Sequence, residues 1–228
     1  MRRKTTRSDL HRYFHDWLDT AFRNGLINRH KREEALSGMQ RHLPAIVAGL
    51  NNRGRAQLRL GTGTLRLFLR EGLDPHNGRF NIFEIQWPRR RRHRRLHCFV
   101  GHRFVKSVSN SLRLNLRHVL EPSNIKLAWS GMDIAAVGFF DDIIRRIRAC
   151  DFCIFDNRWA SERPNVYIEV GIAYALAKPF ILANYQGNRI GVPSDLTHIL
   201  NIPYKSYADL CRTLYFQLPV FLRETELR

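Results

Sequence analysis

Apolar side chains recur at helical spacing in two segments near the start of the chain. Residues 8–24 carry six apolar side chains that fall on one face of a helix, and Ser8 is placed to cap its first turn. Residues 31–49 show similar spacing, with a break at Pro44, because proline removes an amide donor from a helix interior. The pattern predicts two helices, the second interrupted near Pro44.

Between residues 56 and 70 the pattern changes to alternation of apolar and polar positions. Leucines alternate with polar or basic residues on both sides of Gly61-Thr62-Gly63, which is typical of a β-hairpin. A third strand is expected at residues 81–87, after the turn-forming residues 74–78. Together with the two helices, these strands predict a small α+β unit.

After residue 95, short apolar runs alternate with helical patterns. Strands are expected at residues 96–100, 125–128, 152–155 and 180–183, and helices at residues 105–120, 139–147 and 164–177. Continuously apolar strands separated by helices are typical of a parallel sheet covered on both faces. The predicted fold class is therefore α/β.

Charge is the unusual property of a chain whose composition is otherwise ordinary. The 228 residues are 44% hydrophobic and 25% charged, which suits one full domain and a smaller one. The net charge is +18, and residues 1–95 hold 22 Lys/Arg against 8 Asp/Glu. Residues 89–95 (RRRRHRR) cannot pack in a core. We expect a basic α+β domain at 1–88, an Arg-rich linker at 89–95 and an α/β domain at 96–228.

The same composition predicts a cytoplasmic protein without a membrane span. The most apolar stretch, residues 166–185, is interrupted by charged residues and a proline, and no apolar run follows the basic residues 1–4. The four cysteines lie in or beside apolar runs, which is typical of reduced, buried thiols. Cys150 and Cys153 have zinc-ligand spacing but no second pair, so no metal site is expected.

Two predicted strand ends carry groups suited to a nucleotide. In parallel sheets, ligands bind beyond the carboxyl ends of the strands. The first strand runs into Gly101, His102 and Arg103, where a glycine allows close approach and two basic side chains can face phosphate. The third runs into Asp156 and Arg158, a carboxylate for a ribose hydroxyl and a guanidinium for phosphate. Ordinary solvated turns would explain both segments as well.

Glu169 is the one charged residue in the apolar run 166–177, which predicts a buried helix. Burying a carboxylate is unfavourable unless it is paired, and no cation lies one turn away along this helix. Either a distant group satisfies Glu169, or it is held in a cleft for chemistry. Its position within two turns of the helix start, at the ligand end of the sheet, favours the second interpretation.

The later part of the chain resembles two known families. The run FVGHRF and the stretch from IKLAWSGMD to AKPFIL resemble Toll/interleukin-1 receptor (TIR) domains. The segment CDFCIFDNRWASERPNVYIEVGIAYALAKPFIL and the later VPSDL are similar to nucleoside 2-deoxyribosyltransferases and to predicted nucleotide-binding TIR-like proteins. The resemblance covers about residues 96–210, and NVYIEVGIAYALAKP carries most of it.

This resemblance implies a five-stranded flavodoxin-like sheet and cleavage of an N-glycosidic bond between ribose and a base. Glu169 matches the catalytic carboxylate of both families. The pair Val166-Tyr167 replaces the Trp-Cys of many TIR domains, and Asn165-Val166 replaces the Gly-Thr of the deoxyribosyltransferases. The substrate-binding residues expected are Gly101, His102, Arg103, Asp156, Arg158 and Asn165.

A second candidate surface consists of arginines on the hairpin and the linker. Its members are Arg55, Arg59, Arg66, Phe68 and Arg70, followed by Arg89, Arg90, Arg91 and Arg92. Phosphate neutralisation together with an aromatic ring for stacking would suit nucleic acid. A solvated basic surface or a contact with an acidic protein fits the pattern equally well.

The leading hypothesis is an intracellular TIR-like enzyme that cleaves the N-glycosidic bond of NAD or a related nucleotide, without another cofactor. Its basic N-terminal domain would recognise a trigger such as nucleic acid or another polyanion. By analogy with the family, it would be an immune or antiphage effector that is active as a homo-oligomer. The alternatives are a non-catalytic nucleotide sensor or adaptor, and a nucleic-acid-binding protein whose α/β unit only oligomerises.

Overall fold

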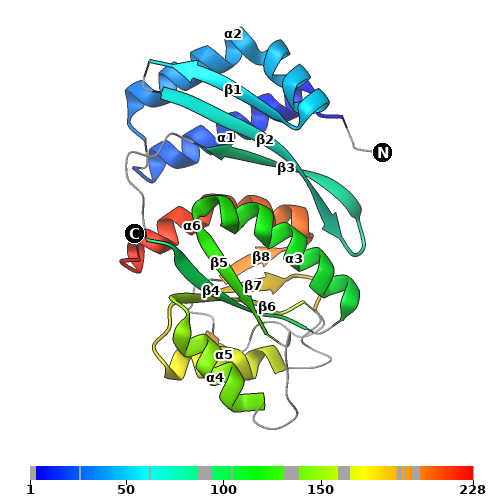
Figure 1. Cartoon of the computed structure of the whole chain (residues 1–228), viewed down its shortest axis with the longest axis vertical. Helices are drawn as coiled ribbons and strands as arrows, with labels where there is room; N and C mark the ends of the chain where they lie inside the picture. Colours follow the sequence, from blue (N-terminus) through cyan, green and yellow to red (C-terminus); the bar gives the residue numbers. More distant parts are fainter. Residues whose placement is uncertain are drawn as a thin grey trace.

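The protein, seen in a computed structural model, consists of two β-sheets with helices between and outside them (Figure 1). The structure describes residues 4–25, 27–61, 63–86, 94–103, 105–130, 139–158, 165–188, 192, 194–196 and 201–227. Its helices are α1 (Arg7–Arg23), α2 (Arg29–Arg53), α3 (Lys106–Leu120), α4 (Phe139–Ala149), α5 (Asn165–Ala175) and α6 (Tyr207–Glu224). Its strands are β1 (Arg55–Leu60), β2 (Gly63–Asp74), β3 (Gly78–Gln86), β4 (Leu96–Gly101), β5 (Ile125–Trp129), β6 (Phe152–Asp156), β7 (Phe180–Tyr185) and β8 (Asn201–Tyr204).

The first two helices differ in detail from the prediction. Helix α1 is capped by Thr6 rather than Ser8, because Thr6 and Asp9 form a reciprocal capping box. Helix α2 runs through Pro44 without interruption. Buried side chains before and after the proline, Met39 and Leu50 among them, hold both parts of α2 in the same core. This packing outweighs the loss of one hydrogen bond.

The first sheet is antiparallel, in the order β1-β2-β3. Leu60 pairs with Gly63, so the predicted hairpin and its tight turn are confirmed. Strand β2 is longer than expected and continues to Asp74, because β3 pairs with it as far as Gly78. The leucines of β2 at 65, 67 and 69 face α1 and α2 in one buried cluster.

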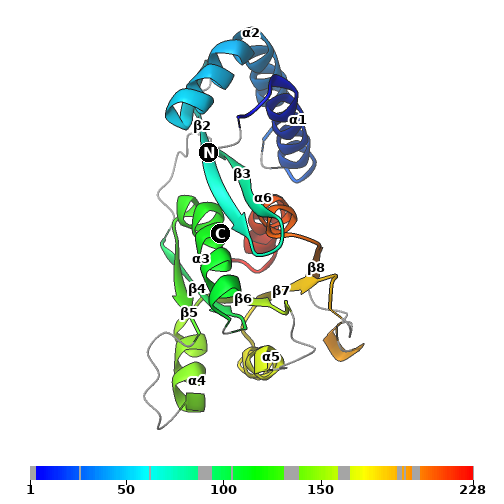
Figure 2. The ribbon, with the colours of Figure 1, turned by 90° about the vertical axis from the view of Figure 1, so that its right-hand side faces the viewer.

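The second sheet has five parallel strands in the order β5-β4-β6-β7-β8, which is the flavodoxin-like order. Helices α3 and α6 cover one face, and α4 and α5 cover the other (Figures 1 and 2). The predicted α/β class and five-stranded parallel sheet are therefore confirmed. The sequence pattern missed β8, because a four-residue strand containing Pro203 shows no periodicity.

Helices α3 and α6 lie between the two sheets and contact both (Figure 2). On α6, Tyr215 accepts a hydrogen bond from the Ile85 amide of β3 at 2.8 Å and donates one to its carbonyl oxygen. On α3, the amide group of Asn115 bonds to both backbone groups of Leu73 in β2, at 3.0 and 2.7 Å. The antiparallel sheet is thus docked onto the α/β unit through partly buried hydrogen bonds. The division of the chain at the linker 89–95 stays a prediction, and Arg89–Arg92 lie outside the described residues.

Within the described ranges, no helix is long and apolar enough to cross a bilayer. The same ranges contain no group of three His, Cys, Asp or Glu side chains placed to hold a metal ion. All four cysteines are buried and unpaired. Burial raises the pKa of Cys150 to about 11, so this thiol stays protonated at neutral pH.

Candidate active site

Glu169 lies on α5 against the carboxyl end of β4, and its side chain is buried. The residue is 4% exposed. A Cβ atom added at Gly101 would overlap Glu169 Oε2 and the ring of Phe155. Gly101 therefore makes room for the carboxyl group at the edge of the sheet where parallel folds bind ligands. The structure thus brings together two of the predicted site residues, Gly101 and Glu169.

The environment of Glu169 favours its protonated form. Burial raises its pKa from the ordinary value of 4.5 to about 8, and a hydrogen bond from the Ser130 hydroxyl opposes this shift. Oε2 is buried and has no hydrogen-bond partner among the described residues. A buried carboxyl group with one oxygen uncommitted is unusual unless that oxygen serves a ligand.

Ser130 connects Glu169 to His102, the residue that follows Gly101. Ser130 Oγ lies 3.5 Å from His102 Nδ1, and His102 Nε2 lies 2.9 Å from Ser109 Oγ at the start of α3. Burial lowers the pKa of His102 to about 4, and the charge of Arg113 adds to this effect. His102 is therefore neutral at physiological pH, and its ring forms a T-shaped pair with the ring of Trp129.

Positive charge gathers at the same end of the sheet. Arg103 is half-buried directly after His102, and Arg113 stacks on Trp129 with its guanidinium 5.4 Å from the ring centre. Helix α3 begins at this edge with no side-chain cap on its amide groups. The two arginines and the uncapped helix start form an electropositive environment for phosphate.

Asp156 is the last residue of β6 and Arg158 follows two positions later, and both are engaged inside the protein. Asp156 accepts hydrogen bonds from the hydroxyls of Tyr204 and Tyr207. Arg158 pairs with Asp74 of β2 at 3.1 Å, and the side chains of both are fully buried. Their predicted roles toward ribose and phosphate stay predictions, and any ligand would have to compete with these contacts. The sixth residue of the predicted set, Asn165, is exposed at the start of α5.

The sequence interpretation missed Ser130, Ser109 and Asp74. A signal existed for Ser130, because it directly follows β5, whose carboxyl end lies beside that of β4. Ser109 lies one turn into a helix and has no such marker. Asp74 was predicted only as a turn residue, and its contact with a residue 84 positions away reveals its role.

The register of the first sheet places the predicted basic residues of the hairpin on one face. Arg55 pairs with Phe68, and the alternation directs these side chains away from α1 and α2, on the same side as Arg59 and Arg66. Those three arginines are exposed. The guanidinium of Arg70 lies 5.0 Å from the Phe68 ring centre and pairs with the buried Glu84, so it is engaged locally.

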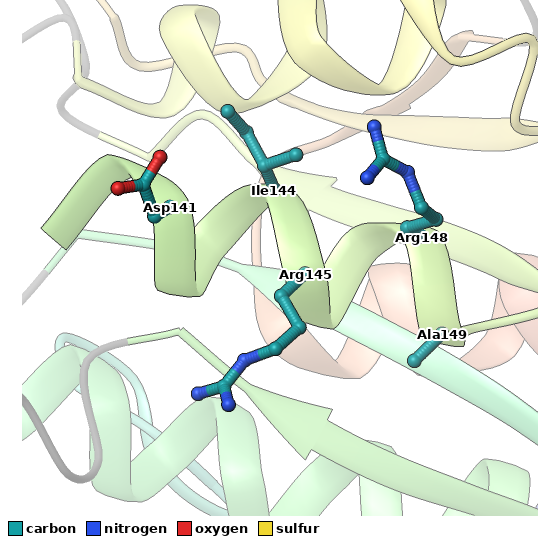
Figure 3. A pocket seen from close by; sticks show the side chains of 5 residues that line it. All are labelled: Asp141, Ile144, Arg145, Arg148 and Ala149. Carbon is teal, nitrogen blue, oxygen red and sulfur yellow. The ribbon is translucent and has the colours of Figure 1, made fainter. Parts of the chain in front are cut away.

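A hollow of about 420 Å³ lies elsewhere, along α4 (Figure 3). It is lined by Asp141, Ile144, Arg145, Arg148 and Ala149, all on one helix. Arg145 pairs with Asp142 on the same helix, as is usual for a solvated helix face. None of the strand-end residues lines this hollow, so we place the candidate site at Glu169.

No protein-family model matches the sequence, and no curated protein sequence matches it. Among solved structures, the CMP N-glycosidase BcmB of Clostridium botulinum is similar over 52% of this chain and 97% of its own, with 17% identity and a TM-score of 0.42. A 2-deoxyribosyltransferase of Bacillus psychrosaccharolyticus is similar over 50% of this chain and 89% of its own, with 14% identity and a TM-score of 0.37. The fold assignment rests on the strand order and pairing of this sheet.

The buried state of Glu169 predicts a pH-dependent stability. Glu169 ionises near pH 4.5 in the unfolded chain but keeps its proton in the folded chain until about pH 8. Between these values the unfolded chain binds fewer protons, so the free energy of unfolding falls as pH rises. Relative to the Glu169→Gln variant, the wild type should lose on the order of 3 kcal/mol between about pH 5 and pH 9.

Urea denaturation of both proteins across this pH range measures the difference. Glu121→Gln is the control, because this side chain is 55% exposed. Its stability should follow that of the wild type at every pH. Parallel curves for the wild type and Glu169→Gln would show that Glu169 ionises normally in the folded chain.

Proposed function

We propose that the protein is an enzyme that cleaves the N-glycosidic bond of a nucleotide, with Glu169 as its catalytic carboxylate. The observation that carries this proposal is the Glu169 carboxyl group, which is 4% exposed, packs against Gly101 and leaves Oε2 without a partner among the described residues. Structural carboxylates in protein interiors normally have partners for both oxygens.

The chemistry follows from charge. Departure of the base leaves positive charge on the sugar, and an adjacent carboxylate stabilises that charge or captures the sugar covalently. Glu169 holds its proton when no cation is near, and the developing sugar cation favours its ionised form. Arg103, which precedes α3, and Arg113, two turns into that helix, would hold the phosphate of the substrate.

NAD or a related nucleotide is the proposed substrate. In NAD the base is a pyridinium, so a positive charge lies beside the bond that breaks and would favour the carboxylate form of Glu169. The sequence resemblance of residues 96–210 to TIR and 2-deoxyribosyltransferase proteins supports glycosidic chemistry. A role in defence and activation by self-assembly are proposed from that resemblance alone.

Base release by the purified full chain tests the proposal. The chain is incubated with NAD, CMP and a deoxynucleoside, with and without added DNA or RNA, and the free base is measured by liquid chromatography. We expect release from at least one nucleotide. Binding of a nucleotide without release under all conditions would favour the sensor hypothesis, in which the same residues hold a ligand without cleaving it.

Nucleic-acid binding is a second candidate function, favoured by the exposed arginines that β1 and β2 place on one face. Binding to duplex DNA should weaken with salt, and each phosphate contact contributes about −0.9 to the slope of log K against log salt. The double variant Arg59→Ser, Arg66→Ser should reduce that slope by roughly two units. The measurement is a salt titration of fluorescent DNA by anisotropy.

Arg12→Ser, Arg29→Ser is the matched control, because both arginines are exposed on the helices rather than on this sheet face. The control should leave the slope unchanged. Equal slopes for the hairpin variant and the wild type would show that the sheet face does not contact phosphates.

A further inference from the structure

Four polar side chains lie next to one another in a row that begins at the candidate catalytic carboxyl. Glu169 contacts the Ser130 hydroxyl, and Ser130 Oγ lies 3.5 Å from His102 Nδ1. His102 Nε2 lies 2.9 Å from Ser109 Oγ, which lies 3.4 Å from the Arg103 carbonyl oxygen. Glu169, Ser130 and His102 are at most 4% exposed, whereas Ser109 is half-buried. This row of polar side chains therefore leads from the interior toward the surface.

The hydrogen atoms of these four groups allow their hydrogen bonds to run in either of two opposite directions. A hydroxyl has one hydrogen, and a neutral imidazole donates from one nitrogen and accepts at the other. When Glu169 is ionised, Ser130 donates to it, His102 donates from Nδ1 to Ser130, and Ser109 donates to Nε2. When Glu169 is protonated, it donates to Ser130, Ser130 donates to Nδ1, His102 donates from Nε2 to Ser109, and Ser109 donates to the Arg103 carbonyl.

We propose that Ser130, His102 and Ser109 form a proton relay that carries the proton of Glu169 to the surface, with His102 changing the ring nitrogen that holds its hydrogen. This inference rests on the proposed function, because it concerns how the proposed catalytic carboxyl changes its charge. Ser130 and His102 act on Glu169 rather than on the substrate, so they are positioning residues.

The protons balance at each step of the relay. The Glu169 proton passes to Ser130 Oγ, the Ser130 hydrogen passes to His102 Nδ1, and the Nε2 hydrogen passes to Ser109 Oγ. The hydrogen that Ser109 held before is released to solvent. One proton leaves the buried carboxyl and one appears at the surface, while both serines and His102 are neutral before and after.

The surroundings favour a neutral His102. Arg113 of α3 is the charged group that acts on it, and Arg103 follows it in the chain. Trp129 of β5 packs against its ring without a charge. On the side of Glu169, the facing titratable group is Cys153 of β6, a thiol whose pKa is raised well beyond the ordinary value by burial. Burial and Arg113 both oppose an imidazolium, so the histidine passes a proton on without storing it.

Nitrogen NMR of the full chain labelled with ¹⁵N-histidine tests the relay without a substrate. The two ring nitrogens of a neutral histidine have distinct shifts according to which one carries hydrogen, and the His102→Asn variant assigns the signal. We expect His102 to carry its hydrogen on Nε2 at about pH 6 and on Nδ1 at about pH 10, with a midpoint at the Glu169 titration. A His102 signal that keeps the same form across this range would overturn the relay.

Three variants distinguish the relay from other causes of a change in the His102 nitrogen signals. Glu169→Gln and Ser130→Ala should each make the His102 form independent of pH. Ser111→Ala removes another buried serine, 1% exposed on α3, and should leave the change intact. A change that persists in Glu169→Gln would also contradict the proposal.

Activity gives an independent readout. Loss of the Ser130 hydrogen bond should raise the pH at which kcat/KM for NAD reaches half its maximum, whereas Ser111→Ala should leave that pH unchanged. A protein that shows the His102 change but releases no base would keep the relay and exclude the proposed enzyme. A protein that releases base with a fixed His102 would keep the enzyme and exclude the relay.

Discussion

Glutamine at position 169 is expected to reduce kcat for base release at least about a thousandfold while leaving the fold and most of the nucleotide affinity intact. The amide has nearly the same shape as the carboxyl group but cannot carry the negative charge that opposes the sugar cation. Glu84→Gln is the matched control, because Glu84 is also buried, at 1% exposed, and burial raises its pKa too. Glu84 lies on β3 of the antiparallel sheet, away from the strand ends of the parallel sheet. The Glu84→Gln variant should therefore keep wild-type turnover.

The pH profile identifies the form of Glu169 that reacts. If the carboxylate opposes a departing pyridinium, kcat/KM for NAD should rise with pH and level off above about pH 8. If the protonated form donates to a neutral base such as that of CMP, the rate should fall above that value instead. Turnover by Glu169→Gln at the wild-type rate would remove Glu169 from the mechanism.

A second expected result concerns the docking of the antiparallel sheet. Asp74→Ala should lower the free energy of unfolding by about 3 to 5 kcal/mol, because it leaves the buried guanidinium of Arg158 without its carboxylate. Asp74 also accepts hydrogen bonds from the backbone amides of Tyr207, at 2.7 Å, and His76, at 2.9 Å. Burial alone would raise the pKa of Asp74, but these bonds and Arg158 lower it.

Glu71→Ala is the matched control on the same strand. Glu71 pairs with Arg79 at 2.9 Å, but the two side chains are 32% and 67% exposed, so its loss should change stability by less than about 1 kcal/mol. In the double variant Asp74→Ala, Arg158→Met, part of the stability should return, because the buried guanidinium that lost its carboxylate is then removed as well. Urea denaturation measures all four proteins, and equal losses for Asp74→Ala and Glu71→Ala would contradict the buried pair.

The depressed pKa of Asp74 adds a dependence on pH. Its folded pKa lies below the ordinary value of 3.8, so the pair contributes its full stability above that value. The contribution is lost as pH falls through the folded pKa. The stability difference between wild type and Asp74→Ala should therefore shrink in acid, opposite in direction to the effect of Glu169.

Local patterns in the sequence determined most of the helices and strands and one candidate catalytic residue, Glu169. Alternation around Gly61 specified a hairpin, and continuous apolar runs specified buried parallel strands, because side-chain periodicity reflects which faces an element buries. Glu169 was conspicuous because a single carboxyl group in an all-apolar helix requires an explanation. These signals depend only on residues close together in the chain.

Tertiary structure alone decided which distant groups meet. His102 and Ser130 are 28 positions apart and Asp74 and Arg158 are 84 apart, and no local pattern links either pair. The first pair meets because β4 and β5 are neighbours in the parallel sheet, and the second because the antiparallel sheet docks on α3 and α6. Packing also kept α2 continuous through Pro44, since buried residues on both sides hold it in one core. Strand order and docking arise from the burial of whole faces, and they determine the partners of Glu169 and Arg158. The sequence by itself determined only that Glu169 needed a partner.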